Sequence, residues 1–227
     1  MIIYCMSDIH GYLSELDYAL SFVEKHLDEA DTKLILLGDY IHGPDSYGVL
    51  DRIIALQEHW GEDKVIVLRG NHEDMACDGT WSIGEPRINN DENIENKKDG
   101  RYIAWMENLP YYYCEGNVIF VHAGIDEELK EAWKWTDEYT CMWKYPPQIG
   151  EFYGNMKIVA GHVGTSEIAQ DPTFHDVFFD GQSHYFIDGT VRKSGVIPVL
   201  KVDTDCDKFY RVTERGEMFI LPYYEEN

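Results

Sequence analysis

The stretch MIIYCMSDIHG, residues 1–11, decides the fold of the N-terminal half. Its apolar first half has the length of a buried β-strand, and it ends directly in a polar Asp-x-His-Gly group. In an extended chain, side chains two residues apart point to the same side, so Asp8 and His10 could bind one ion. The opening therefore predicts a strand that presents metal-type ligands at its carboxyl end.

The first seventy residues continue with an alternation of helices and strands. Further apolar strands are predicted at residues 34–37 and 65–68. A helix with apolar residues three and four apart is predicted over 13–27, and another over Ser46–His59. Continuous apolar strands joined by helices indicate a sheet that is covered on both faces, and so an α/β fold.

Residues 78–100 interrupt this rhythm, because they are rich in asparagine, glycine and charge. We interpret them as a surface loop or lid, with disorder as the alternative. Strand-like segments then return and predict a β-rich second sheet packed against the first; they are 111–114, 118–122, 157–160, 177–179, 185–187, 196–202 and 209–213. The chain has no clear linker, so we expect a single domain over residues 1–227.

The composition excludes several classes of partner. The chain has 42 acidic and 19 basic residues and a net charge of -23, which argues against binding to a nucleic-acid duplex or an anionic membrane. An anionic substrate would need local cations, which points towards metal ions. The sequence has neither a signal peptide nor an apolar run of ~18 residues, so we expect a cytoplasmic protein. Its five scattered cysteines indicate neither disulfides nor a thiolate zinc site. The oligomeric state is left open.

Five predicted strands end in groups that commonly ligate metals. Each group alone has an ordinary explanation: a Gly-Asp is often a turn, and a strand-end histidine is often simply capped. Their repetition at five strand ends favours one shared crevice, where the carboxyl ends of strands meet. Nitrogen and oxygen ligands without a thiolate suit Mn, Fe, Zn, Co or Ni. The groups are Asp8-x-His10, Gly38-Asp39, Gly70-Asn71-His72-Glu73, His122-Ala123-Gly124 and Gly161-His162.

As a set, these motifs resemble those of the calcineurin-like metallophosphoesterases. The resemblance is strongest to the phosphoprotein phosphatase branch, which includes bacterial Ser/Thr phosphatases and symmetrical diadenosine-tetraphosphate hydrolases. It implies two mixed β-sheets in a sandwich flanked by helices, in four layers. It also implies two divalent metal ions, Mn or Fe/Zn. Carried over by residue, Asp8 and His10 would bind the first ion, Asp39 would bridge both, Asn71, His122 and His162 would complete the second, and His72 would be the general acid.

The physical chemistry agrees with these implied roles. Two divalent ions bring +4, and the ligands Asp8 and Asp39 leave about +2, enough to hold a phosphoryl dianion and ionise a bridging water. In-line attack by that hydroxide needs no covalent protein nucleophile, which fits the absence of a reactive Ser or Cys motif. His72 can supply a proton near neutral pH. Glu73 would support the ligands without binding metal.

The turn after the second motif departs from the family pattern. The branch usually reads Gly-Asp-x-x-Asp-Arg-Gly, whereas residues 38–45 here read GDYIHGPD and are one residue short. The aspartate that orients the general acid and the arginine that binds phosphate therefore do not carry over. His42 either contacts phosphate in place of the arginine or simply fills the turn. Asp45 is a candidate to orient His72.

Two other cations are candidate phosphate contacts. Arg69 matches a phosphate-binding arginine of the family. Lys144 falls near a place where the family often has an arginine, but a lysine lacks the bidentate fork. The aromatic residues between 133 and 145 either form a core helix face or line a base or peptide pocket.

The leading interpretation is a Ser/Thr protein phosphatase-like phosphomonoesterase that uses a dimetal-bridged hydroxide on a phosphorylated protein or small phosphate ester. The alternative is a nucleoside polyphosphate hydrolase of the diadenosine tetraphosphate type, which the aromatic segment favours. A third possibility is a non-catalytic scaffold with this fold. The altered turn at His42 supports the scaffold, and the intact His72 and six metal ligands oppose it.

Overall fold

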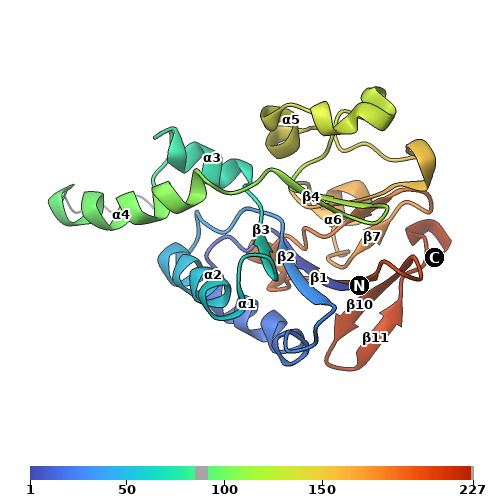
Figure 1. Cartoon of the computed structure of the whole chain (residues 1–227), viewed down its shortest axis with the longest axis horizontal. Helices are drawn as coiled ribbons and strands as arrows, with labels where there is room; N and C mark the ends of the chain where they lie inside the picture. Colours follow the sequence, from blue (N-terminus) through green and yellow to red (C-terminus); the bar gives the residue numbers. More distant parts are fainter. Residues whose placement is uncertain (85–91, 226–227) are drawn as a thin grey trace.

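Two β-sheets form the centre of the molecule (Figure 1), whose computed structural model describes residues 1–84 and 92–225. The first sheet contains β1 (Ile2–Met6), β2 (Thr32–Leu36), β3 (Val65–Val67), β9 (Val199–Asp203), β10 (Lys208–Thr213) and β11 (Gly216–Phe219), in the order β11-β10-β9-β1-β2-β3. The second contains β4 (Tyr112–Glu115), β5 (Val118–Val121), β6 (Lys157–Ala160), β7 (Phe178–Phe179) and β8 (His184–Phe186), in the order β4-β5-β6-β8-β7.

Both sheets are mixed. In the first, β1, β2 and β3 are parallel, and β9, β10 and β11 follow as antiparallel neighbours. In the second, β5, β6 and β8 are parallel, with β4 and β7 antiparallel at the edges. The parallel strands place their carboxyl ends together, which is where the polar motifs of the sequence begin.

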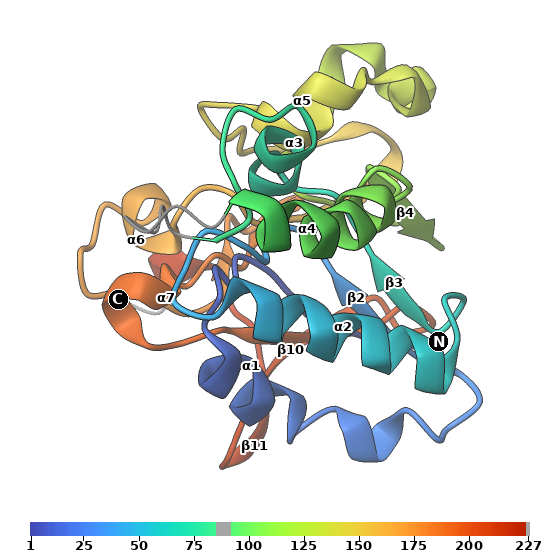
Figure 2. The same cartoon turned by 90° about the vertical axis from the view of Figure 1, so that its left-hand side faces the viewer.

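The helices cover the outer faces of the two sheets. They are α1 (Leu13–Leu20), α2 (Ser46–Trp60), α3 (Asn71–Cys77), α4 (Glu92–Met106), α5 (Glu138–Trp143), α6 (Thr165–Ile168) and α7 (Val191–Ser194), with 3₁₀ segments at Glu24–His26, Glu127–Trp135, Tyr153–Asn155 and Tyr223–Glu225. Figure 1 shows α1 and α2 on the side of the first sheet and α5 beyond the second, and Figure 2 shows α4 lying above α2. Among the described helices, none is long and apolar enough to cross a membrane.

Alternating side chains of the central strands fill different layers. Ile3 and Cys5 of β1 belong to the core between the two sheets, whereas Tyr4 and Met6 belong to the core under α1 and α2. A third core lies between the second sheet and the segment that carries Trp133. These three cores separate four layers and confirm the predicted pair of mixed sheets flanked by helices.

The first predicted helix is shorter than its apolar pattern. It ends at Leu20, although the pattern continues through Leu27. After the helix the backbone hydrogen bonds join residues that are three apart instead of four. The Ser21 hydroxyl also donates to the Tyr18 carbonyl at 2.6 Å. Leu27 is still buried, so the apolar spacing located the core contacts correctly but not the end of the helix.

The prediction of a loop or lid over residues 78–100 is wrong from residue 92 onward. Residues 85–91 of it lie outside the described part of the chain. The α4 helix begins at Glu92, and Tyr102 and Met106 near its end are buried in the core under α2. Packing of these two side chains stabilises a helix that the polar first half of the segment does not indicate.

Two predicted strands belong to the first sheet and not to the second. These are β9 and β10, which pair with β1 and with each other. The sequence also gave no indication of β11, because all four of its residues are exposed and show no buried alternation. Strand order depends on pairing between distant segments, which apolar patterns do not specify.

Candidate metal centre

The five polar motifs meet at the carboxyl ends of the parallel strands. Asp8 and His10 follow β1, and Asp39 follows β2. Asn71 and His72 open α3 directly after β3, while His122 and His162 follow β5 and β6. The backbone N–H of His162 donates to Asp8 Oδ2 at 3.0 Å, although the two residues are 154 positions apart. The structure thus brings together all six predicted ligands and the predicted general acid.

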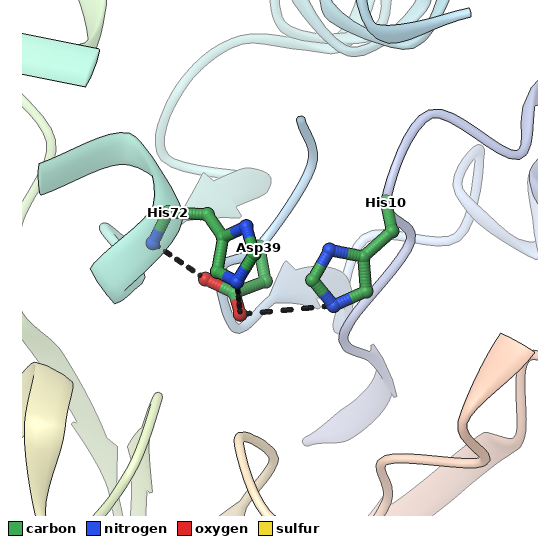
Figure 3. A group of neighbouring side chains, drawn as sticks. All are labelled: His10, Asp39 and His72. Atoms are coloured by element: carbon green, nitrogen blue, oxygen red, sulfur yellow. Dashed lines mark hydrogen bonds and ion pairs between the residues drawn. The ribbon is translucent and has the colours of Figure 1, made fainter. Parts of the chain in front are cut away.

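Asp39 lies between two groups of ligand atoms. Its Oδ2 is 3.8 Å from His10 Nε2 and 3.7 Å from His72 Nε2 (Figure 3). Its Oδ1 is 3.4 Å from His122 Nε2, and His162 completes that second group. One carboxylate therefore turns its two oxygens towards two clusters, which is the geometry of a bridging ligand.

The histidine tautomers leave lone pairs facing the clusters. His10 Nδ1 lies 3.2 Å from the Ile41 carbonyl, and His122 Nδ1 lies 3.1 Å from the Leu37 carbonyl. Because a carbonyl only accepts hydrogen bonds, each Nδ1 carries the proton and each Nε2 presents a lone pair. Backbone carbonyls commonly orient metal-binding histidines in this way.

Asn71 faces the second cluster with its amide oxygen. Asn71 Oδ1 lies 2.9 Å from His122 Nε2 and 3.0 Å from His162 Nδ1. Turning the amide would let its nitrogen donate to both rings, and that arrangement competes with a cation for the same point. With the oxygen inward, three neutral lone-pair groups and Asp39 converge, and a divalent cation fits this set of nitrogen and oxygen donors.

Strained backbone holds these ligands. A positive φ is uncommon for residues other than glycine and costs roughly 1–3 kcal/mol where it occurs in sparsely populated regions. Glycines allow the close approach: a Cβ at Gly161 would collide with the Asp8 carboxylate, and one at Gly70 with that of Asp39. The left-handed residues of the site are Asp8 (54°), His10 (46°), Asp39 (59°), His42 (67°) and His162 (65°).

The carboxylates of the site are buried close together. Burial, reinforced by Asp188 and Asp39, holds the pKa of Asp8 well above its ordinary value. Burial likewise raises the pKa of Asp188 to about 6. Burial opposes ionisation of Asp39 as well, but His122, His72 and His10 hold its pKa below the usual range. A cation would relieve the repulsion between these carboxylates.

Asp188 is a site residue that the sequence reasoning missed. It lies near Asp8, is 8% exposed, and follows Ile187 just after β8. A signal was present, because Ile187-Asp188-Gly189 repeats the pattern of an apolar strand end, an acid and a glycine.

Glu73 joins the second and third motifs. Its fully buried carboxylate accepts hydrogen bonds from the backbone N–H groups of Asp39 (2.8 Å), Tyr40 (2.8 Å) and Gly70 (3.0 Å). It therefore fixes the backbone of the bridging ligand without facing the clusters itself. This geometry agrees with the supporting role expected from the sequence.

The Glu73→Ala variant is expected to lose about 3 kcal/mol or more of unfolding free energy, because three buried N–H groups would lose their acceptor. Urea denaturation monitored by circular dichroism measures this loss. Glu58→Ala, at an exposed position of α2, is the matched control and should change stability little. An unchanged urea midpoint for Glu73→Ala would contradict the assigned role.

His42 lies behind the predicted general acid. Its Nδ1 is 2.8 Å from His72 Nδ1, and its ring stacks on Trp81 with centroids 4.5 Å apart. His42 thus occupies the place of an orienting partner for His72, which was expected of Asp45. Asp45 is engaged elsewhere, because its carboxylate caps α2 by accepting from the Gly48 N–H at 3.0 Å.

The two other predicted phosphate contacts differ in placement. Arg69 is nearly buried, and its Nη2 donates to Asp74 Oδ1 at 2.9 Å. Lys144 is directed elsewhere: its Nζ donates to Ile125 O (2.6 Å), Gln148 Oε1 (2.9 Å) and Glu127 Oε1 (3.3 Å). These three acceptors use all its donors, so we do not retain Lys144 as a phosphate contact, whereas Arg69 stays a prediction.

Lys144 belongs to a buried ion cluster under β8. His184 lies between Glu127, 3.1 Å from its Nε2, and Asp180, 2.9 Å from its Nδ1. Burial by itself would lower the pKa of His184, but the hydrogen bonds to Asp180 and Glu127 raise it above its ordinary value. When His184 is protonated, it and Lys144 together balance the two carboxylates. The need of Glu127 for cationic partners explains why Lys144 contacts this carboxylate.

This cluster predicts a pH-dependent stability. Because the folded-state pKa of His184 is raised, its contribution is fully present below the unfolded value of about 6.5 and is lost as pH rises through the folded value. The His184→Gln variant should be less stable than the parent by about 3 kcal/mol near pH 6, since it leaves the buried Asp180 carboxylate without its cationic partner. The difference should shrink towards higher pH.

Thermal and urea unfolding of both proteins across this pH range would measure the difference. His59→Gln, at an exposed position of α2, serves as the control for losing a histidine from the surface. A stability difference that stays constant with pH would contradict a charged His184.

The aromatic residues between 133 and 145 lie in different environments. Trp133 is buried and belongs to the third core, as a core face predicts. Trp135, Tyr139 and Tyr145 are instead 84%, 68% and 66% exposed. The Nε1 of Trp143 donates to Asp74 Oδ2 at 3.1 Å. The core interpretation is therefore wrong for most of this segment, because the 3₁₀ segment ends at Trp135 and α5 begins only at Glu138, so no single helix carries these residues.

Comparison with known proteins identifies the family. The family model described as calcineurin-like phosphoesterase matches residues 1–204, and the chain belongs to this family. Among curated proteins, a symmetrical bis(5'-nucleosyl)-tetraphosphatase of Neisseria meningitidis is 31% identical over 125 residues. That match covers 54% of this chain and 43% of the relative, so it spans less than half of the relative's length.

Solved structures share the fold at low sequence identity. A cold-active protein-tyrosine phosphatase of a psychrophilic Shewanella species superimposes with a TM-score of 0.71 at 16% identity, over 97% of this chain and 80% of that one. A putative diadenosine tetraphosphatase gives 0.60 at 16% identity, over 93% and 92%. A protein serine/threonine phosphatase of Saccharomyces cerevisiae gives 0.57 at 14% identity, over 97% and 79%.

Proposed function

We propose that this chain is a metal-dependent phosphohydrolase, and specifically a phosphomonoesterase of the Ser/Thr protein phosphatase type. Its substrate would be a phosphorylated protein or a small phosphate ester. The observation that carries the proposal is the position of Asp39, whose Oδ1 and Oδ2 face two separate groups of ligands. Membership in the calcineurin-like phosphoesterase family supports the same reaction class.

The ligand geometry suggests how two divalent ions, Mn or Fe/Zn, would be held. Asp8, His10 and Asp39 would hold one ion, and Asp39 would share the other with the ligands of the second cluster: Asn71, His122 and His162. Bound there, the ions would supply a nucleophile from water at neutral pH and neutralise charge on the phosphoryl oxygens.

His72 would complete the reaction as the general acid. Its Nδ1 contacts His42, so its Nε2 faces the cluster, 3.7 Å from Asp39 Oδ2. From this atom it would donate a proton to the leaving oxygen. Arg69 would steady the phosphate, provided that its link to Asp74 leaves donors free for the substrate.

Metal removal tests the proposal directly. With excess EDTA, hydrolysis of p-nitrophenyl phosphate is expected to fall to background and to return when Mn²⁺ is added. The melting temperature should also fall, because ions that bind only the folded chain stabilise it. Equal activity of the chelated and the Mn²⁺-loaded protein would overturn the metal mechanism.

The alternative reaction is hydrolysis of a nucleoside polyphosphate, the kind of substrate named for the symmetrical tetraphosphatase of Neisseria to which part of this chain is similar. Rates with Mn²⁺ on p-nitrophenyl phosphate, a phosphopeptide and diadenosine tetraphosphate would rank the two activities. Turnover of the dinucleotide far above that of the other two would displace the phosphomonoesterase. The scaffold interpretation predicts metal-dependent turnover of none of them.

A further inference from the structure

A cavity of about 450 Å³ opens beside the metal centre on the side of His10 and His72. None of the second-cluster ligands His122, His162 and Asn71 is among the described residues that line it. A general acid must lie next to the oxygen that it protonates. The cavity is therefore on the leaving-group side of the phosphate, and its size is typical of sites for small molecules.

Trp81 forms an aromatic wall of this cavity. One face of its indole stacks on His42, with 22° between the ring planes, while the side chain as a whole is 46% exposed. The backbone N–H of Trp81 donates to the Met75 carbonyl at 3.0 Å, and this bond fixes the loop after α3. A supported indole with free surface is a platform on which another flat ring can stack.

Arg192 gives the cavity a cation. It is exposed on α7, and it is the one permanently positive side chain among the described lining residues. The one lining carboxylate is Asp188, which lies deep beside Asp8. Thr190, the residue before α7, also lines the cavity. Its φ is 52°, a strained conformation for a β-branched residue, and this conformation sets the direction in which the short helix leaves. In a chain with net charge -23, a cation placed here is a local exception.

We propose that this cavity selects the leaving group of the substrate, and that it takes a planar aromatic group carrying a further negative charge. The ring would stack on Trp81, and its anionic substituent would meet Arg192. Both residues then determine specificity and not the bond-breaking step. This inference rests on the proposed phosphohydrolase function. Among the substrates named there, it favours small phosphate esters over phosphoserine or phosphothreonine, because the leaving group must contain an aromatic ring and a second anion. A carboxyaryl phosphate and a nucleotide both supply such a leaving group.

The test compares three esters with Mn²⁺-loaded enzyme: ethyl phosphate, phenyl phosphate and 4-carboxyphenyl phosphate. Intrinsic reactivity cancels when each variant is compared with the parent on the same ester. Trp81→Ala is expected to lower kcat/KM for both aryl esters at least about fivefold more than for ethyl phosphate. Arg192→Ala should lower it about threefold more for the carboxyaryl ester than for phenyl phosphate.

Two matched controls and one rescue sharpen the result. Lys193→Ala removes the neighbouring exposed cation, which does not line the cavity, and Trp135→Ala removes an exposed tryptophan of the 3₁₀ segment. Neither should change the ratios between esters. Trp81→Phe keeps a flat ring and should restore most of the preference for aryl esters. The comparison with ethyl phosphate separates stacking from any disturbance of His42, because a disturbance that acts through His72 would lower the rate on ethyl phosphate at least as much. Adding ADP as a fourth substrate distinguishes a nucleotide source from a carboxyaryl one.

Equal losses on all esters in Trp81→Ala and Arg192→Ala would overturn the inference while leaving the phosphohydrolase intact. If the parent hydrolyses no ester, the proposed function itself fails. Saturation-transfer NMR with 4-hydroxybenzoate then still decides the inference: binding that weakens in both variants supports the cavity as an aryl-anion site, and binding that is absent or unchanged in them refutes it.

Discussion

The Asp39→Asn variant is expected to lose about a thousandfold or more in kcat/KM for any phosphate ester, since residues that act as a unit cannot be removed singly without losing most of the rate. An asparagine offers one oxygen, so its NH₂ group would face one of the two clusters and repel a cation there. It would also lack the negative charge that holds both ions together. Steady-state rates together with metal analysis of the purified protein measure both effects.

Asp63→Asn is the matched control, because it makes the same chemical change at an exposed position just before β3. The control should keep full activity and metal content. Retention of both metals and activity within tenfold of the parent in Asp39→Asn would show that this carboxylate does not bridge.

The His72→Asn variant is expected to lose about a hundred- to ten-thousandfold in kcat, the usual contribution of general acid catalysis, while keeping its metal ions. The loss should be smallest for p-nitrophenyl phosphate, because p-nitrophenolate leaves readily without a proton. His59→Asn, at an exposed position of α2, should behave as the parent.

This variant also separates two roles that the geometry allows for His72. Its Nε2 lies close enough to His10 and Asp39 to share an ion with them. If His72→Asn loses one equivalent of metal and its rate loss is equal for good and poor leaving groups, His72 is a ligand and not the acid.

The sequence predicted the location of the ligands well for a physical reason. Parallel strands connected by helices bring their carboxyl ends to one edge, so a polar group after each strand must enter a common crevice. Asp8, Asp39 and His122 could be placed in this way without knowing the length of any helix.

What the sequence did not predict depends on contacts between side chains far apart in the chain. Lys144 was expected at the phosphate, but the buried Glu127 determines its position. His42 meets His72 only because the shortened turn adopts a left-handed conformation, which no propensity of histidine indicates. The exposed strand β11 is defined by pairing with β10, and its own residues bury nothing.

The hydrogen bond between the His162 N–H and Asp8 Oδ2 has a consequence for how the protein is made. Asp8 leaves the ribosome 154 residues before its partner from the second sheet. Contacts of such separation form slowly, and incomplete chains expose apolar strands in the meantime. Until then the backbone of Asp8 has its hydrogen bond to the Gly38 carbonyl (3.1 Å), but its carboxylate lacks the His162 N–H. We expect chains arrested before residue 157, where β6 begins, to bind no metal at the second cluster, so that metal uptake marks the docking of the two sheets during synthesis.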